Sequence, residues 1–549
     1  MSEQTGQLLS APRAPRLPGP WSTGAALIAL VVVLPILSVV YFALTPSENI
    51  WPHLLSTTLP RYLVNTAILM AGVGAVTAVV GTVTAWLVVM YRFPGRGWLQ
   101  WALLMPLAVP AYVGAYALVD FLEYAGPVQT AMRDTFGWAS ARDYWFPQIR
   151  TRWAAVVVIS ASLYPYVYLL TRAALREQSG AVYEVARALG AGAFGRFFRV
   201  GLPLARPAIA AGVAVVMMET VNDFGTVDYF AVQTLTTGIF SVWRQGGNLG
   251  GAAQIALVIL VIIVLLVTLE KISRRRSKFA ATARNQRPIM PVALSGWRGW
   301  AATALCAAPV ALGFVLPVGV LLSHAFDAGE WVAPGLMSAL LRTLAVCGAA
   351  AVVTVAGGLF MVYGVRLSGR RLPQLLMPVT ALGYAAPGAV LALGILVPLA
   401  AFDNRLADAI LAVTGKDPGL LLTGSAGALV LAFVVRFFAI AQGTTDAALG
   451  RVSPSLPMAA RALGRSAGGA LRAVHLPLIR ASVGSALLLV FVDGVKELPA
   501  TLMLYHNDTL ATRVYAKASL EKLSEAAPAA LMITLVGLCA VTLLARANR

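Results

Sequence analysis

Two clusters of polar residues inside long apolar segments are the part of this sequence best suited to chemistry. They lie in the stretches ETVNDFGT and DGVKELPAT and comprise Glu219, Asn222, Asp223, Asp493, Lys496 and Glu497. In each cluster the residues stand at positions i, i+3 and i+4, so an α-helix would present them on one face. Carboxylates are hard oxygen donors that suit hard cations, and they also pair with basic side chains. The clusters therefore predict either a lining for a cation or a set of ion pairs.

Both clusters are expected deep in a membrane. Each begins roughly 15 residues after a Leu-Pro pair, about 22 Å along a helix and past the midplane. An ionisable group that faces lipid costs ~2.5 kcal/mol or more, so these side chains should face the bundle interior or a wet cavity. Either they line a translocation pathway or close its outer gate, for example through a Lys496–Asp223 pair, or they only join helices or touch outer water. Gly225 and Pro499 predict that each helix breaks just beyond its cluster.

The membrane assignment rests on composition. The chain has 549 residues, of which 59% are hydrophobic and 12% charged. Apolar runs of about 20 residues recur, which is the length of a helix that crosses a hydrocarbon core of ~30 Å. We therefore predict an all-α polytopic membrane protein. The net charge of +19 is explained by Lys and Arg residues in cytoplasmic loops, so it does not indicate nucleic-acid binding. The three cysteines and four histidines show no disulfide or metal-ligand spacing, so no metal site is predicted.

The sequence predicts twelve spans with both termini in the cytoplasm, because the basic loops then fall on the inner side. The spans are expected at about 23–44, 66–91, 99–122, 153–175, 204–227, 252–269, 301–323, 338–364, 374–401, 419–442, 478–503 and 528–545. The predicted parts are a tail at 1–21, a first six-span half at 22–270, a basic cytoplasmic linker at 271–300 and a second six-span half at 301–549.

An internal repeat relates the two halves. The stretches 183–203 and 457–477 carry the same polar pattern, each between two apolar segments, and Gly190 aligns with Gly464 at an offset of 274 residues (464 − 190). The same offset aligns the two charged clusters. With an even number of spans per half, the halves should pack about a pseudo-two-fold axis along the membrane normal, with a pathway between them. The pattern residues are Glu184, Ala186, Arg187, Gly190, Leu202, Pro203, Met458, Ala460, Arg461, Gly464, Leu476 and Pro477.

These stretches resemble the EAA loop of importer-type ABC transporter permeases: Glu-Ala-Ala, three residues, Gly, nine residues, Ile-x-Leu-Pro. Val185 and Val200 replace two motif positions in the first copy, and Met458 replaces the glutamate in the second. The resemblance implies that each stretch is a coupling helix that docks on an ATP-binding subunit, so two copies of that subunit are expected. Small residues would permit close packing, and the glycines a sharp turn out of the helix. The missing glutamate predicts unequal contacts, with the first stronger.

The chain itself is not expected to be an enzyme. No P-loop pattern occurs, since Gly415-Lys416 is followed by Asp417. The resemblance therefore implies that ATP and Mg²⁺ belong to a separate partner subunit, and no cofactor is expected in this chain. It also implies a periplasmic or lipid-anchored solute-binding protein on the outer face of a bacterial inner membrane.

The stretches 222–243 and 495–504 look like those of fused ferric-iron importer permeases, a likeness that covers nearly the whole chain. Ferric iron is the substrate that this resemblance favours, and thiamine and polyamine permeases of the same architecture are alternatives. A different class is a secondary transporter driven by an ion gradient, with four carboxylates as its proton or sodium sites: Glu219, Asp223, Asp493 and Glu497. The duplicated docking stretch favours the ABC importer, because a gradient-driven carrier does not need it.

Overall fold

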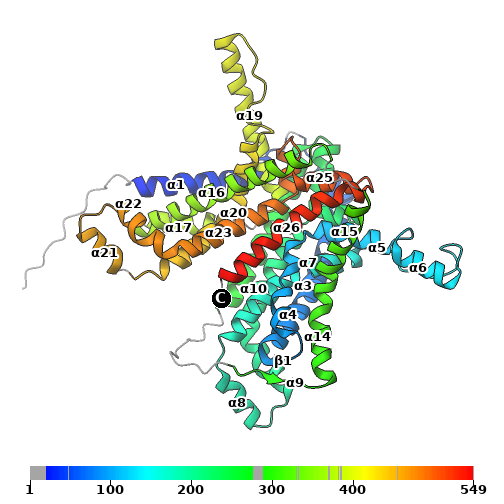
Figure 1. The fold of residues 1–549 in the computed structure, drawn as a ribbon. Coiled ribbons are helices and arrows are strands. Elements are labelled where there is room, and N and C mark those ends of the chain that lie inside the picture. Colours follow the sequence, from blue (N-terminus) through cyan, green and yellow to red (C-terminus); the bar gives the residue numbers. More distant parts are fainter. Residues whose placement is uncertain are drawn as a thin grey trace, which may run out of the picture.

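The computed structural model describes residues 20–46, 48–275, 289–328, 331, 333–368, 371–380, 383, 386–453 and 455–547. Most of the predicted tail at 1–21 and the centre of the predicted linker lie outside the described residues. The described chain is almost entirely helical (Figure 1), which confirms the predicted fold class. Eleven of its helices are long and apolar enough to cross a membrane, or twelve if one bent pair counts as a span.

The helices follow the apolar runs, because a chain in lipid must satisfy its backbone polar groups internally. The first part contains α1 Pro20–Leu44, α2 Trp51–Ser56, α3 Leu59–Met90, α4 Arg96–Ala102, η1 Met105–Ala108, α5 Ala111–Leu122, α6 Pro127–Phe136, α7 Arg152–Arg176, α8 Gly180–Ala188, α9 Ala193–Arg196, η2 Phe197–Gly201, α10 Leu202–Asn222, α11 Gly225–Tyr229, α12 Leu235–Phe240, η3 Ser241–Gln245 and α13 Leu249–Arg275. The second contains α14 Trp297–Val310, η4 Ala311–Val315, α15 Leu316–Ala328, α16 Leu336–Ser368, α17 Arg371–Thr380, α19 Gly388–Thr414, α20 Ala426–Gly450, α21 Ser455–Ala462, α22 Ala467–Ala470, η6 Leu471–His475, α23 Leu476–Lys496, α24 Pro499–Leu504, α25 Leu510–Ala518 and α26 Leu523–Ala547.

The third predicted span, 99–122, is wrong as one continuous helix. The helical segments 96–108 and 111–136 meet at an angle of 94°. The chain turns at Val109, whose ψ of 118° is extended, and at Pro110, which has no N–H to donate. The break at Pro110 therefore divides the predicted span into two pieces.

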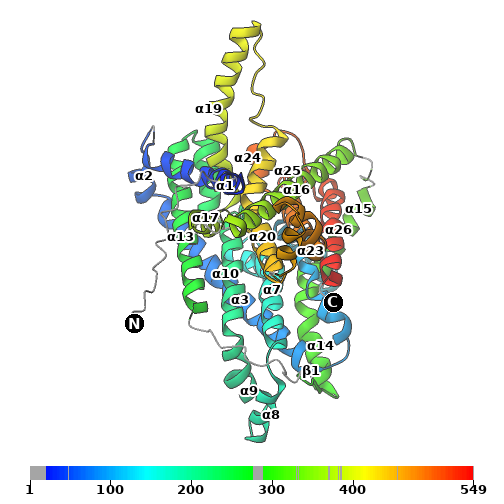
Figure 2. The ribbon, with the colours of Figure 1, turned by 90° about the vertical axis from the view of Figure 1, so that its left-hand side faces the viewer.

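The ninth predicted span, 374–401, is also interrupted. α17 ends at Thr380, and α19 begins at Gly388 directly after Pro387. α19 then continues to Thr414, well beyond the predicted end, and it stands out from the rest of the molecule in Figures 1 and 2.

Two helical bundles meet at one end and diverge toward the other. One contains α3, α7 and α10, and the other contains α16, α20 and α23 (Figure 1). The first helix of each sequence half crosses to the other bundle: α1 packs against α16, α17 and α19, and η4, which continues α14, packs against α7 and η1. The sequence halves therefore interlock, and neither is a separate spatial unit.

Close helix packing holds the first bundle together. A Cβ atom at Gly81 on α3 would lie 2.7 Å from Val167 Cβ on α7, and one at Gly212 on α10 would lie 2.8 Å from Val167 Cα. Small residues at such contacts let helix backbones approach in a membrane. α7 is thus fixed between α3 and α10, and this contact sets the position of the charged residues of α10.

A two-residue ladder attaches the end of the linker to the first bundle. β1 (Tyr91–Arg92) pairs in parallel with β2 (Val292–Ala293), with Tyr91 opposite Val292. The described end of the linker is therefore hydrogen-bonded to the protein rather than being only a solvated loop, and α14 begins at Trp297, a few residues before the predicted boundary.

Candidate functional site

The charged clusters lie where two spanning helices end. α10 stops at Asn222 and α23 at Lys496, so each helix ends one residue before the last member of its cluster and not beyond the cluster, as was predicted. The prediction of a single helical face is wrong for the last residue of each cluster. Asp223 and Glu497 have extended ψ angles of 128° and 120° and lie past the helix ends.

Each of these two carboxylates caps the short helix that follows it. Asp223 accepts hydrogen bonds from the backbone N–H groups of Thr226 and Val227, at 3.0 and 3.2 Å. Glu497 accepts from those of Ala500 and Thr501, at 3.1 and 3.2 Å. Anionic groups are stabilised at helix N-termini by unpaired N–H groups and the helix dipole. The two halves therefore use a carboxylate at the same repeat position for the same local purpose.

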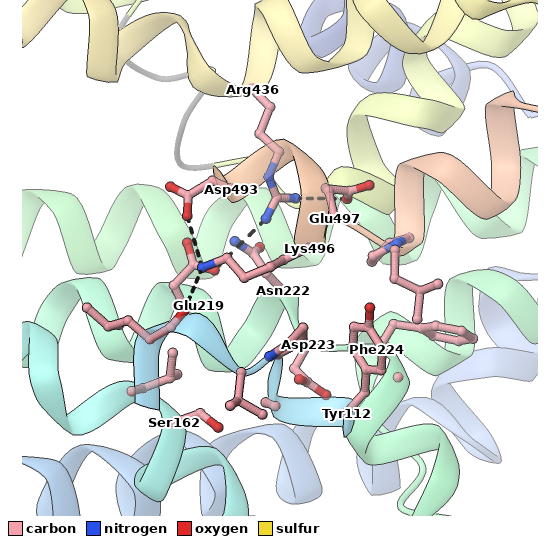
Figure 3. A pocket seen from close by; sticks show the side chains of 18 of the residues that line it. Tyr112, Ser162, Glu219, Asn222, Asp223, Phe224, Arg436, Asp493, Lys496 and Glu497 are labelled. Carbon is pink, nitrogen blue, oxygen red and sulfur yellow. Dashed lines mark hydrogen bonds and ion pairs between the residues drawn. The ribbon is translucent and has the colours of Figure 1, made fainter. Parts of the chain in front are cut away.

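All six predicted residues line one cavity of about 130 Å³ between the bundles (Figure 3). α10 contributes Glu219 and Asn222, and α23 contributes Asp493 and Lys496. We call this cavity the charged chamber. The chamber contains four carboxylates and two cations, which give it a formal charge of −2 (2 − 4). The cations are Lys496 and Arg436, the latter on α20. Among the described residues, no three acidic, histidine or cysteine side chains are arranged to hold a metal ion.

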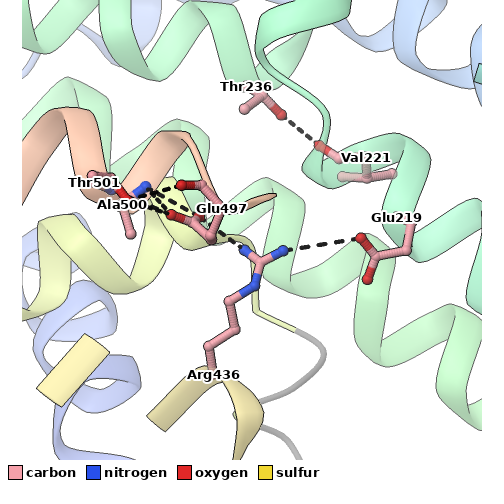
Figure 4. A network of polar contacts seen from close by, with 7 residues as sticks. All are labelled: Glu219, Val221, Thr236, Arg436, Glu497, Ala500 and Thr501. Atoms are coloured by element: carbon pink, nitrogen blue, oxygen red, sulfur yellow. Dashed lines mark hydrogen bonds and ion pairs between the residues drawn. The ribbon is translucent and has the colours of Figure 1, made fainter. Parts of the chain in front are cut away.

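Arg436 joins the two bundles through the chamber. Its Nη1 lies 3.4 Å from Glu497 Oε1, and its Nη2 lies 4.0 Å from Glu219 Oε2 (Figure 4). The side chains of Arg436 and Glu497 are only 10% and 2% exposed. Removal of one partner from such a buried pair leaves an uncompensated charge, which typically costs ~3–5 kcal/mol. Arg436 is thus the side chain on which the charge balance of the chamber depends.

The expected pair between Lys496 and Asp223 is not formed. Lys496 Nζ instead lies 3.2 Å from Asp493 Oδ1, one turn earlier on its own helix, and donates to the carbonyl oxygen of Leu107 at 3.2 Å. Helix geometry explains the difference, because residues at i and i+3 are neighbours on one face. The contact with Leu107, on η1, still links the two bundles.

Sequence reasoning missed Arg436 and its repeat counterpart. The 274-residue offset aligns Arg436 with Ser162 (436 − 274), which also lines the chamber. The available signal was one arginine within the apolar stretch LVLAFVVRFFAIA. A charge inside a membrane span is costly and usually marks a partner or a pathway.

The two predicted docking stretches form matching short helices. α8 ends at Ala188 and α21 at Ala462, and the following Gly190 and Gly464 have φ angles of +81° and +83°. This left-handed backbone is strained for residues with a Cβ atom, so the predicted glycine turns are present. In the first copy the N–H of Ala191 donates to Ala186 O, and the second copy repeats this bond between Arg465 and Ala460.

The Leu-Pro pair shapes the return from each docking helix to its span. A π-helical turn, η2 or η6, directly precedes Leu202-Pro203 and Leu476-Pro477. Proline cannot donate to the carbonyl four residues earlier and clashes with it, and a wider turn relieves both problems. The motif proline therefore imposes the same local geometry in both halves.

The docking helices and the residues that directly follow them expose apolar side chains. Val185 and Leu189 are 58% and 83% exposed, and Met458 and Leu463 are 67% and 85% exposed. In Figure 1, α8 and α21 lie at the far ends of the bundles, away from where the bundles meet. Apolar groups gathered on short helices of this kind are typical of a surface that another protein covers.

The meeting end of the bundles carries further polar contacts between the halves. Arg150 Nη2 lies 2.8 Å from Glu521 Oε1, and the hydroxyl of Tyr515 donates to Asp228 Oδ2 at 2.7 Å. Burial raises the pKa of Asp228 above its ordinary 3.8, and the hydrogen bond from Tyr515 opposes that shift. These contacts, together with Arg436, hold the bundles against each other at the end opposite the docking helices.

Comparison with known families identifies the architecture. The chain matches, at 77–279 and again at 354–549, the family described as binding-protein-dependent transport system inner membrane component. The chain belongs to this family. Each matched segment contains one docking stretch and one charged cluster. The protein is therefore a multi-pass permease subunit of an ABC-type importer, with two permease units in one chain.

Relatives differ in how much of the chain they cover. A Fe(3+)-transport system permease protein of Haemophilus influenzae is 27% identical over 545 residues, which cover 95% of this chain and 97% of the relative. A molybdenum transport system permease protein of Escherichia coli is 28% identical over 184 residues, 32% of this chain and 76% of the relative. A sulfate transport system permease protein of Escherichia coli is 30% identical over 155 residues, 28% of this chain and 52% of the relative.

Proposed function

We propose that this permease imports ferric iron across a bacterial inner membrane. The observation that carries the proposal is the charged chamber, where four carboxylates from both halves meet between the bundles. The relative named for Fe(3+) transport supports it, because the similarity extends over both permease units. Hard cations prefer oxygen donors, and the formal charge of the chamber favours a cation over an oxyanion.

In this proposal the chamber residues line or gate the pathway. Glu219 belongs to the first half and Arg436 to the second, so separation of the halves breaks their ion pair. The first half then presents Glu219 and Asp223 without a cationic partner. Arg436 and Lys496 neutralise carboxylates in the closed chamber, and a passing cation replaces that charge when the halves move apart.

The energy for this movement comes from partner subunits. α8 and α21 each dock on one copy of an ATP-binding subunit in the cytoplasm, and ATP and Mg²⁺ bind there rather than to this chain. The exposed apolar side chains of both helices support this assignment. A solute-binding protein delivers the iron at the opposite face, and both termini lie in the cytoplasm.

Transport into proteoliposomes tests the proposal. The chain is reconstituted with its ATP-binding and solute-binding partners, and uptake of labelled ferric iron is measured with and without ATP. ATP-dependent uptake of iron, with no uptake of molybdate or sulfate, is the expected result. Iron uptake that persists without the ATP-binding subunit and collapses with an uncoupler would instead identify a gradient-driven carrier.

Substitutions in the chamber separate a pathway role from a structural one. Asp223→Ala and Glu497→Ala should impair iron uptake while the ATP-binding subunit still co-purifies. Asp417→Ala is the matched control, because Asp417 is an exposed carboxylate on a loop outside the chamber. Normal uptake by both chamber variants would show that these carboxylates serve only as helix caps.

A further inference from the structure

A larger cavity of about 530 Å³ lies between the bundles on the docking-helix side of the charged chamber. The two cavities share Leu107, Tyr166, Asp493 and Lys496. Arg172 and Arg176 line the large cavity, six and ten residues after Tyr166 on α7 and therefore about 9 and 15 Å closer to α8. Most of the remaining lining is apolar. The arginines thus form a cationic end of an otherwise apolar space.

Arg172 is buried without a carboxylate partner. Only 6% of the residue is exposed, and its Nε has no hydrogen-bond partner. Its Nη2 donates to Gln100 Oε1 at 3.1 Å, and Arg176 Nη2 approaches the same oxygen at 3.4 Å. The guanidinium also lies 5.1 Å from the ring centre of Trp101. A neutral amide and an aromatic ring solvate the cation but do not neutralise it.

Comparison with the second half shows which acidic partner the first half lacks at this position. The 274-residue offset aligns Arg172 with Asp446 (446 − 172) and Arg92 with Arg366 (366 − 92). In the second half Arg366 Nη2 pairs with Asp446 Oδ1 at 2.7 Å. In the first half, an arginine replaces that acid. No ion pair joins Arg172 or Arg176 to a carboxylate among the residues that the structure describes.

We propose that Arg172 and Arg176 form a binding site for a phosphate-type oxyanion at the inner end of this cavity. A buried cation without a partner is costly, and guanidinium groups match the oxygens of phosphate in bidentate geometry. Asp493 is the acid that lines the same cavity, and Lys496 neutralises it at the far end. The apolar lining suits the chains of an anionic phospholipid whose phosphate group binds the arginines. A free oxyanion from the cytoplasm offers the same chemistry.

Thermal unfolding of the purified, delipidated full-length chain distinguishes the two sources. One arm adds phosphatidylglycerol, with phosphatidylcholine as its control. The other adds sodium phosphate, with sodium chloride at equal ionic strength. At a ligand concentration about 100 times the Kd, a chain of this size should gain about 2 °C in Tm. A gain with phosphatidylglycerol alone identifies the lipid, and a gain with phosphate alone identifies the free ion. No gain in either arm overturns the proposal.

Variants test whether the gain in Tm arises from ligand binding to Arg172 and Arg176. Arg176→Gln should remove most of the gain and should fold, because Arg176 is exposed. Arg172→Asp, which restores the acid of the second half, should abolish it. Arg298→Gln is the control for attraction to a basic surface, since Arg298 is exposed on α14 outside the cavity. An unchanged gain in Arg176→Gln, or an equal loss in Arg298→Gln, would refute the assignment.

Discussion

The two halves share a backbone plan but differ in the charges placed on it. In both, a glycine with positive φ follows the docking helix, a π-helical turn precedes a Leu-Pro pair, and a carboxylate caps a short helix beyond the span. In the chamber, however, Ser162 and Asn222 of the first half align with Arg436 and Lys496 of the second. Among charged side chains, the first half contributes only acids, whereas the second contributes two acids and both cations.

This difference shows which features the duplicated fold requires and which are free to diverge. Glycine turns, proline turns and helix caps satisfy backbone groups, so both copies need them. Side chains that face the space between the halves can meet the other half as well as their own, as Arg436 does with Glu219 and Glu497. The two halves can therefore contribute different charged residues to one network. As a result, the contact between the halves is asymmetric.

The largest expected effect on binding of the ATP-binding subunit is at the shared docking turns. Gly190→Asp or Gly464→Asp adds strain at positive φ and places a carboxylate within the proposed contact. A buried, unpaired charge costs about 2 kcal/mol or more, so binding of the ATP-binding subunit should weaken by about thirtyfold. Co-purification and ATP-dependent uptake measure the effect.

The control for this strain lies on the other side of the molecule. Gly247 has a φ of +62° with no atom within 4 Å of an added Cβ, and its repeat counterpart, Glu521, already carries a side chain at +59°. Gly247→Asp should leave coupling intact. Equal losses in Gly190→Asp and Gly247→Asp would mean that strain, rather than docking, causes the defect.

The next prediction tests the difference in charge between the two halves of the chamber. Arg436→Gln leaves Glu219 and Glu497 without their cation, which should cost ~3 kcal/mol of stability and impair iron uptake. Thermal unfolding and uptake assays measure the two effects. Ser162→Ala, at the counterpart position, should change stability by less than about 0.5 kcal/mol.

A double variant tests whether charge balance is the cause. Glu219→Gln in the Arg436→Gln background should recover part of the lost stability, because fewer carboxylates then remain unpaired. No recovery, together with an equally large effect of Ser162→Ala, would show that packing rather than charge dominates the chamber.

A smaller effect concerns the unequal docking helices. Glu184→Met gives the first docking helix the residue that the second has at Met458. Loss of one exposed charge contact costs about 0.5–1 kcal/mol, so affinity for the ATP-binding subunit should fall about two- to fivefold. Met458→Glu should strengthen binding or leave it unchanged. A loss of affinity in Met458→Glu would contradict the inequality.

The smallest effect is a pH dependence at the contact between Asp228 and Tyr515. Because burial raises the pKa of Asp228, its charged form destabilises the folded state. Wild-type stability should therefore fall as pH rises from the ordinary pKa of 3.8 through the raised value. Asp228→Asn keeps an acceptor for Tyr515 and should remove this fall, as followed by Tm between about pH 4 and pH 8. Asp417→Asn is the control, and an equal change there would contradict the assignment.

Much of this architecture was accessible from the sequence because its causes are local. Apolar runs predict spans, since backbone groups in lipid must bond within their own helix. Gly225 and Pro499 predicted that the helices end near the charged clusters, although the ends fall one residue inside the clusters, and Gly190 and Gly464 predicted the docking turns. The 274-residue repeat predicted that the two clusters occupy equivalent places.

Only the tertiary structure decided how these elements meet. The sequence does not show that Arg436 faces the chamber, that Lys496 pairs with Asp493 instead of Asp223, or that Arg172 is buried without an acid. It also does not show that the span around Pro110 bends by 94° or that α1 packs on the second bundle. Spacing along a helix determines which residues share a face, whereas the partner of that face depends on packing between segments hundreds of residues apart.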